Sequence, residues 1–164
     1  MVVTKESVLP LDASPLKEYS EPKSEKWLLW LPPIGWLWNH SRWQRWASPH
    51  RQAFEQILRG RPDIPMDVWG DTEHQGAAGR VLAIIDDNFG WPNGRFVPWD
   101  PVCVAMWAYE DGLDDMSAIS DIENTFGVTF PDALWLDIYQ GTLAELIDAL
   151  LAKAVTKCDF DSQC

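Results

Sequence analysis

The side chains that could do chemistry are few in this sequence, and their spacing does not predict a catalytic centre. The histidines are His40, His50 and His74. All three precede residue 77, and no candidate nucleophile lies near them in the sequence. Asp86-Asp87 and Asp114-Asp115 are adjacent pairs, so on a helix their members point in different directions. Because phosphate-loop, dinucleotide-loop, GxSxG and HExxH motifs are also absent, we expect a protein that is not an enzyme and holds no cofactor.

The cysteines predict neither a disulfide framework nor a metal site. The chain has 3 cysteines but no CxxC motif and no Cys/His spacing suited to zinc. Cys103 lies in an apolar run and is expected to be a small buried side chain. Cys158 and Cys164 lie in a polar tail, and the sequence leaves open whether they form a local disulfide.

Charge is distributed unevenly along the chain. Residues 1–62 hold nine Lys/Arg and six Asp/Glu, a net of +3, whereas residues 63–164 hold four and nineteen, a net of -15. An acidic body repels nucleic-acid phosphates and anionic lipids, so we expect no nucleic-acid partner. The acidity favours a partner protein with a basic surface, or it serves solubility alone. Without a basic start and an apolar stretch typical of a signal peptide, a cytoplasmic location is expected.

The first third of the chain combines a polar start with a concentration of tryptophan. Residues 1–25 contain three prolines and no sustained period, and we predict a flexible tail. The tryptophan cluster that follows consists of Trp27, Trp30, Trp36, Trp38, Trp43 and Trp46. Its apolar run is too short to span a bilayer, and Pro32-Pro33 would break a helix there. Two interpretations stay open: the cluster packs on the acidic body, or it contacts a membrane interface.

Helix signals begin at residue 48. Ser48 suits an N-cap, Pro49 suits the first helical turn, and Gly60 suits the C-terminal cap of a helix over 48–60. Its apolar stripe consists of Phe54, Ile57 and Leu58. A loop is predicted over 61–76, so residues 26–76 form a tryptophan-rich segment plus a helix that packs on the body.

Helical periodicity continues through the second half of the chain. A helix over 77–89 carries Val81, Leu82, Ile84, Ile85 and Phe89 at helical spacing. The connection 95–110 is too apolar for a solvated loop and should pack on the core. A helix over 112–126 has a stripe of Ala118, Ile119, Ile122 and Phe126. Residues 132–139 predict one helical turn. Thr142 caps a last helix through Ala154, followed by a tail over 157–164, and the apolar stripe of this helix is Leu143, Leu146, Ile147, Leu150 and Leu151.

Several of these segments resemble acyl carrier proteins. Asp111-Gly112-Leu113 resembles the Asp-Ser-Leu at which the second carrier helix begins, and Phe130-Pro131-Asp132 is similar to the Ile-Pro-Asp before the third. Arg80–Ile85 resembles the first helix, and Thr142-Leu143 the fourth. The resemblance covers about half of the chain. It implies a mainly all-α fold, a carrier-like four-helix bundle over 77–156 with an N-terminal tryptophan-rich extension and helix.

One substitution removes the chemistry that the family normally performs. Gly112 stands where the family has the serine that carries phosphopantetheine, and glycine has no side-chain oxygen for that bond. Ser117 and Ser120 lie on the same predicted helix but out of register with the family serine. The resemblance therefore implies a member without phosphopantetheine. An atypical carrier modified at another serine, Ser117, stays open as an alternative.

The resemblance also implies a surface for a partner protein. In carriers, the second helix presents exposed apolar residues ringed by acids to basic partner enzymes. The corresponding residues here are Leu113, Asp114, Asp115, Met116, Asp121 and Glu123. We therefore expect a non-enzymatic protein-interaction module. The alternative is a peripheral membrane or lipid-contacting protein that uses the tryptophan cluster.

Overall fold

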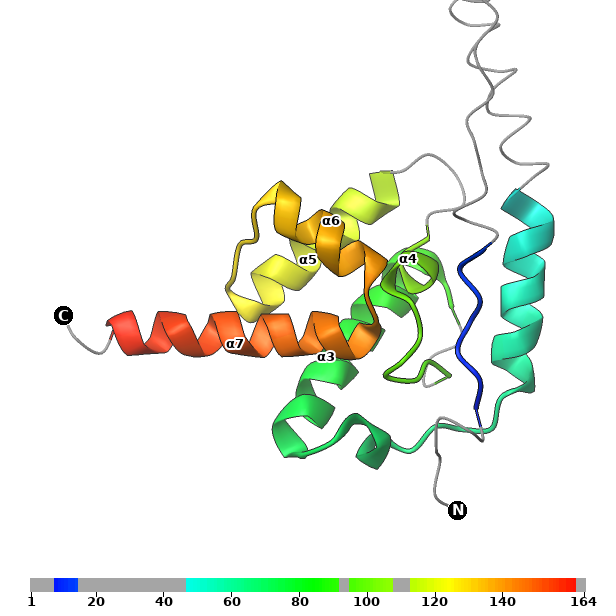
Figure 1. The fold of residues 1–164 in the computed structure, drawn as a ribbon, viewed down its shortest axis with the longest axis horizontal. Coiled ribbons are helices and arrows are strands. Elements are labelled where there is room, and N and C mark those ends of the chain that lie inside the picture. The colour runs from blue at the N-terminus through cyan, green and yellow to red at the C-terminus, as the bar shows by residue number, and fades with distance from the viewer. Residues whose placement is uncertain (1–7, 15–46, 92–94, 108–112, 162–164) are drawn as a thin grey trace, which may run out of the picture.

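The secondary structure of the protein is helical throughout its described part. The computed structural model describes residues 8–14, 47–91, 95–107 and 113–161 (Figure 1). Within these ranges the chain forms helices and no strand, with a single isolated antiparallel bridge between Pro101 and Thr142. Besides the helical residues 47–60, the elements are η2 (Met66–Trp69), α3 (Thr72–Phe89), α4 (Val102–Ala105), α5 (Leu113–Phe126), α6 (Asp132–Gln140) and α7 (Leu143–Asp161). The expected all-α class is confirmed.

Helix α3 begins five residues earlier than the sequence periodicity predicts. Asp71 is its N-cap, and the Asp71 carboxylate accepts hydrogen bonds from the backbone N–H groups of Glu73 and His74 at 3.1 and 3.0 Å. This cap satisfies donors that have no partner inside the helix. At the other end, Gly90 has a φ of 62°, the left-handed conformation that ends helices and favours glycine. The predicted loop over 61–76 is therefore wrong for residues 66–69 and 72–76.

Helix α7 starts at a capping box and runs past its predicted end. The Thr142 N–H donates to Glu145 Oε2 at 2.7 Å, and the Glu145 N–H donates to Thr142 Oγ1 at 3.4 Å. The predicted apolar stripe is buried at Leu143, Leu146, Ile147 and Leu150. The helix continues beyond Ala154 to Asp161, so the predicted tail over 157–164 is wrong for residues 157–161.

The apolar connection before α5 packs against the first turn of α7. Val102 N–H donates to the Gly141 carbonyl, while the carbonyls of Asp100 and Pro98 accept from Leu143 and Ala144 N–H at 2.9 and 2.8 Å. These carbonyls satisfy donors that α7 leaves free at its start. The connection also contains the short helix α4, which confirms that residues 95–107 are no solvated loop.

One continuous core joins the 47–60 helix to α3, α4, α5, α6 and α7. Its members from the first helix include Phe54 and Leu58, which are 4% and 0% exposed. Five of the predicted stripe residues are not fully buried, among them Ile84, Ile119 and Leu151, which are half-buried. Ile57 is 48% exposed, and Phe126 is half-buried with the Arg80 guanidinium 4.3 Å from its ring centroid. Cys103, expected to be buried, is half-buried beside the core.

Part of the predicted flexible tail is docked on the body. Residues 8–11 run beside the 47–60 helix as a stretched segment, drawn in blue in Figure 1. Val8 and Leu11 are 6% and 2% exposed, and Leu11 belongs to the main core. The tail prediction therefore does not hold for this stretch. The tryptophan cluster of residues 27–46 and Gly112 lie outside the described residues.

Candidate functional site

The predicted partner surface falls on α5, and its residues have different surroundings. Leu113, Asp114 and Asp115 form the first turn of α5, but their side chains lie outside the described part of the chain. Met116 is 65% exposed, and Asp121 is also exposed. The opposite face of the helix is buried at Ala118 and Ile122. Helix α5 therefore separates a core face from an exposed side, on which Met116 and Asp121 lie about 140° apart around the helix axis.

Glu123 has an internal function that sets it apart from the exposed acids. Its Oε1 accepts the Phe130 N–H at 2.7 Å and the Trp135 indole N–H at 3.0 Å. Phe130 and Trp135 are themselves buried and meet edge to face with ring centroids 5.4 Å apart. Glu123 therefore ties the end of α5 to α6 and positions the turn between them.

Helix α6 adds exposed apolar side chains that the sequence interpretation did not assign to a surface. Leu136 is 66% exposed and Leu134 is 39% exposed, whereas Trp135 and Ile138 are buried. The signal in the sequence was weak because residues 132–139 were expected to form only one helical turn. With a full helix, the burial of Trp135 and Ile138 places Leu136 on the outside. Asp132 and Asp137 on the same helix are also exposed.

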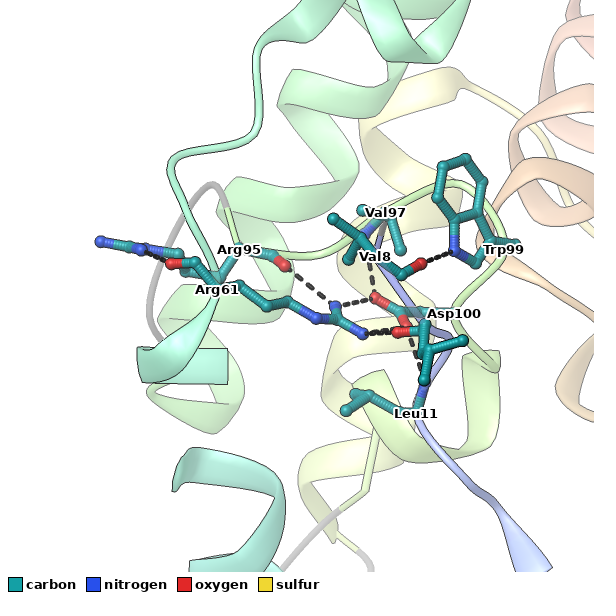
Figure 2. Close-up of polar contacts among 8 residues, drawn as sticks. Val8, Leu11, Arg61, Arg95, Val97, Trp99 and Asp100 are labelled. Carbon is teal, nitrogen blue, oxygen red and sulfur yellow. Dashed lines mark hydrogen bonds and ion pairs between the residues drawn. The ribbon is translucent and has the colours of Figure 1, made fainter. Parts of the chain in front are cut away.

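A buried ion pair, which we call the polar hub, joins distant parts of the chain (Figure 2). Arg61 Nη1 and Nη2 bind Asp100 Oδ2 and Oδ1 at 2.6 and 2.9 Å, and the two residues are 6% and 0% exposed. Asp100 also accepts the N–H groups of Val97 and Leu11, both at 2.9 Å. The Arg61 guanidinium donates further to the carbonyls of Arg95 and Leu9.

The polar hub has a structural function, and sequence reasoning missed it. Every named polar atom of the pair has a partner, and no buried side-chain nitrogen or oxygen among the described residues lacks one. The signal that could have found it is Asp100 itself, the single acid in the otherwise apolar connection between Arg95 and Tyr109. A buried acid needs a cationic or N–H partner, which is a reason to search for an arginine that packs near it.

His74 forms a second polar contact, between the start of α3 and the middle of α7. Its Nδ1 lies 2.7 Å from Asp71 Oδ1, and its Nε2 lies 3.2 Å from Asp148 Oδ1. The hydrogen bond to the Asp71 carboxylate raises the pKa of His74 above its usual 6.5, and Asp148 contributes in the same direction. Hydrogen bonds from the backbone and ring of His74 lower the pKa of Asp71.

This contact predicts a pH-dependent contribution to stability. A raised histidine pKa means that the stabilisation is complete below about pH 6.5 and is lost as the pH rises through the higher folded-state pKa. His74→Gln should therefore lower the melting temperature more at about pH 5.5 than at about pH 8.5. Thermal unfolding of both proteins at the two pH values measures the difference. An equal loss at both values would show that the histidine charge does not contribute.

The described residues offer no other arrangement typical of a catalytic or metal site. No group of three or more His, Cys, Asp or Glu side chains among them could hold a metal ion. No helix in the described ranges is long and apolar enough to cross a membrane. Comparison with protein-family models, with curated proteins and with solved structures found no match to this chain.

Proposed function

We propose that this chain is a non-enzymatic protein-interaction module that binds a basic protein surface through α5 and α6. The observation that carries the proposal is the exposed apolar side chains of Met116 and Leu136 on helices that also expose Asp121, Asp132 and Asp137. A contiguous apolar patch rimmed by polar residues marks an interaction surface, and we propose that Met116 and Leu136 belong to one such patch. The acids favour a partner with Lys and Arg side chains.

We further propose a carrier-like arrangement of α3, α5, α6 and α7 that does not take phosphopantetheine. Two features support the arrangement: the order of the helices along the chain, and the packing of α3 against both α5 and α7. Glycine at position 112 supports the inference that phosphopantetheine is not attached there, because glycine has no side-chain oxygen to form the phosphodiester. Ser117 and Ser120, both exposed on α5, would be the remaining acceptors on this helix.

A site-specific crosslinking experiment tests the interaction surface. A photoreactive residue at Met116 should capture a partner protein, whereas the same residue at Ala83, exposed on α3, serves as the matched control. With the purified pair, Met116→Lys should weaken binding about tenfold or more, because a charged side chain replaces an apolar contact. Binding should also weaken in high salt if the acids contribute. Equal capture from Ala83, or binding unaffected by Met116→Lys, would contradict the proposed surface.

Modification by a phosphopantetheinyl transferase gives a separate outcome. Incubation of the chain with a broad-specificity transferase and coenzyme A should leave its intact mass unchanged, since position 112 has no hydroxyl group. The Gly112→Ser variant is the matched test of whether the surrounding surface is still recognised. Mass spectrometry reads both results. A gain of one phosphopantetheine group at Ser117 or Ser120 in the unaltered chain would instead support an atypical carrier.

A further inference from the structure

Residues 8–11, which we call the strap, are held on the body through their own main chain. The Trp99 indole N–H donates to the Val8 carbonyl at 2.9 Å, and Arg61 Nη2 donates to the Leu9 carbonyl at 2.7 Å. The Leu11 N–H donates to Asp100 Oδ1 at 2.9 Å. Figure 2 shows the contacts of Val8 and Leu11 beside the polar hub. Recognition of the main chain by fixed side chains is typical of sites that bind extended peptides.

The two end residues of the strap are buried, and the two middle residues are exposed. Val8 packs with Ile64 and Val97 in a small cluster of its own, and Leu11 enters the main core. Leu9 between them is 74% exposed. Pro10 is exposed and has no N–H group that would need a partner. The body therefore reads an aliphatic side chain at the first position and leucine at the fourth, and it leaves the second position free.

Two of the three side chains that hold the strap, Arg61 and Asp100, are oriented by contacts inside the body. Arg61 and Asp100 bind each other through two hydrogen bonds, and Asp100 also accepts the Val97 N–H. Arg61 donates to the Arg95 carbonyl as well. Since these contacts do not involve residues 8–11, the site has partners that orient it when the strap leaves. A site oriented in this way loses less entropy when it binds a peptide.

We propose that Arg61, Ile64, Val97, Trp99 and Asp100 form a peptide-binding site, the strap site, which residues 8–11 occupy as an exchangeable internal ligand. The partner that fits it is an extended segment with an aliphatic residue at its first position and leucine at its fourth, and the third position accepts proline because the body binds no N–H group there. Such a segment competes with the strap for the same three main-chain contacts. This site is separate from the surface of α5 and α6, and its test does not depend on the function proposed for that surface.

Exchange of the strap is the direct test. A protease site is inserted after Ser24 in the full-length chain, and the folded protein is cleaved so that the strap is no longer covalently joined to the body. A fluorescent peptide of residues 7–14 is then added in excess and followed by anisotropy. The cleaved protein should bind one peptide as the original fragment leaves. The uncleaved chain should bind it more weakly, because its own strap is present at an effective concentration on the order of millimolar.

Peptide and protein variants make the test specific to the pattern. The Leu11→Ala peptide should bind about 30-fold more weakly or worse, as large-to-small changes at buried positions imply. The Leu9→Ala peptide should bind within about twofold, because Leu9 is exposed. In the cleaved protein, Trp99→Phe removes the donor to Val8 and should weaken binding about two- to tenfold.

Three results would overturn the proposal. The first is a cleaved protein that keeps its original fragment for days without exchange, which would make the strap a permanent part of the core. The second is loss of the helical circular dichroism signal on cleavage, since a ligand site must persist without its ligand. The third is equal binding of the Leu9→Ala and Leu11→Ala peptides, which would show that the site does not read the pattern.

Discussion

Replacement of Asp100 by asparagine is expected to lower the free energy of unfolding by about 3–5 kcal/mol, because it leaves the Arg61 guanidinium buried without a counter-charge. Arg61 is 6% exposed, and Asp100 is completely buried. Asparagine keeps the shape but replaces one acceptor oxygen by an NH2 donor, so the change removes the charge and also leaves two N–H groups without an acceptor. Urea unfolding followed by circular dichroism measures the loss. For a domain whose total stability is about 5–15 kcal/mol, the variant would be close to unfolding.

A double-mutant cycle separates the ion pair from its surroundings. Arg61→Met removes the cation, and the Arg61→Met/Asp100→Asn protein has no unpaired buried charge. The stability loss of the double variant should therefore be clearly smaller than the sum of the two single losses, because each single change leaves one buried group without its partner. Additive losses, or a loss below about 1 kcal/mol for Asp100→Asn, would mean that water reaches the pair and that the polar hub does not hold the strap site together.

Phe54→Ala is expected to cost about 3–5 kcal/mol, as the removal of a buried aromatic side chain does. Phe54 is 4% exposed and meets the Trp107 ring edge to face, with centroids 5.8 Å apart. The contact joins the 47–60 helix to the connection that leads toward α5. The same unfolding measurement gives the loss, which tests whether this helix belongs to the core of the body.

Ile57 on the same helix is the matched control. It lies three residues from Phe54 but is 48% exposed, so Ile57→Ala should change stability by only about 0.5 kcal/mol. Phe54→Ala and Ile57→Ala change helix propensity by similar amounts. The difference between their stability losses therefore reports core packing. Equal losses would mean that the helix is oriented differently on the body.

The helices with strong local signals were predictable from the sequence. Thr142 and Glu145 form the start of α7, and the leucines that follow at helical spacing are buried as predicted. Similarly, apolar residues between 95 and 107 were expected to pack, and they do. These features depend on residues within a few positions of one another, which a single sequence displays directly. The carrier-like arrangement of the helices stays a prediction.

Contacts between distant residues could not be predicted in the same way. The strap is held by Asp100, which is 89 residues from Leu11, and nothing in the local composition of residues 8–11 indicates it. The polar composition of residues 1–25 favoured a flexible tail. A sequence does not show that a backbone N–H group, such as that of Leu11, has an acceptor far along the chain. The length of helix α6 was underestimated for a related reason. Its two buried side chains contact residues distant in the sequence: Trp135 donates to Glu123, and Ile138 packs in the core.

The candidate surface was predicted in part. Periodicity along α5 correctly predicted that Ala118 and Ile122 are buried, whereas only the resemblance to carrier proteins suggested that Met116 is exposed. Periodicity could not distinguish the exposed Asp121 from Glu123, since both are acids on the polar side of the stripe. Their difference arises from the turn at Gly127, which brings Phe130 and Trp135 back to the Glu123 carboxylate.

The place of the strap in the sequence has a consequence for the order of folding during synthesis. A ribosome adds about 5–20 residues per second, so Asp100 follows Leu11, 89 residues earlier, by roughly 4–18 s. Throughout that interval the strap lacks Trp99 and Asp100, which supply two of its three main-chain contacts, although Arg61 and Ile64 are made earlier. The 47–60 helix and α3 can form by local contacts in the meantime, whereas the strap can only join a body that is already assembled. The strap is therefore made before the body but is among the last segments to reach its native position.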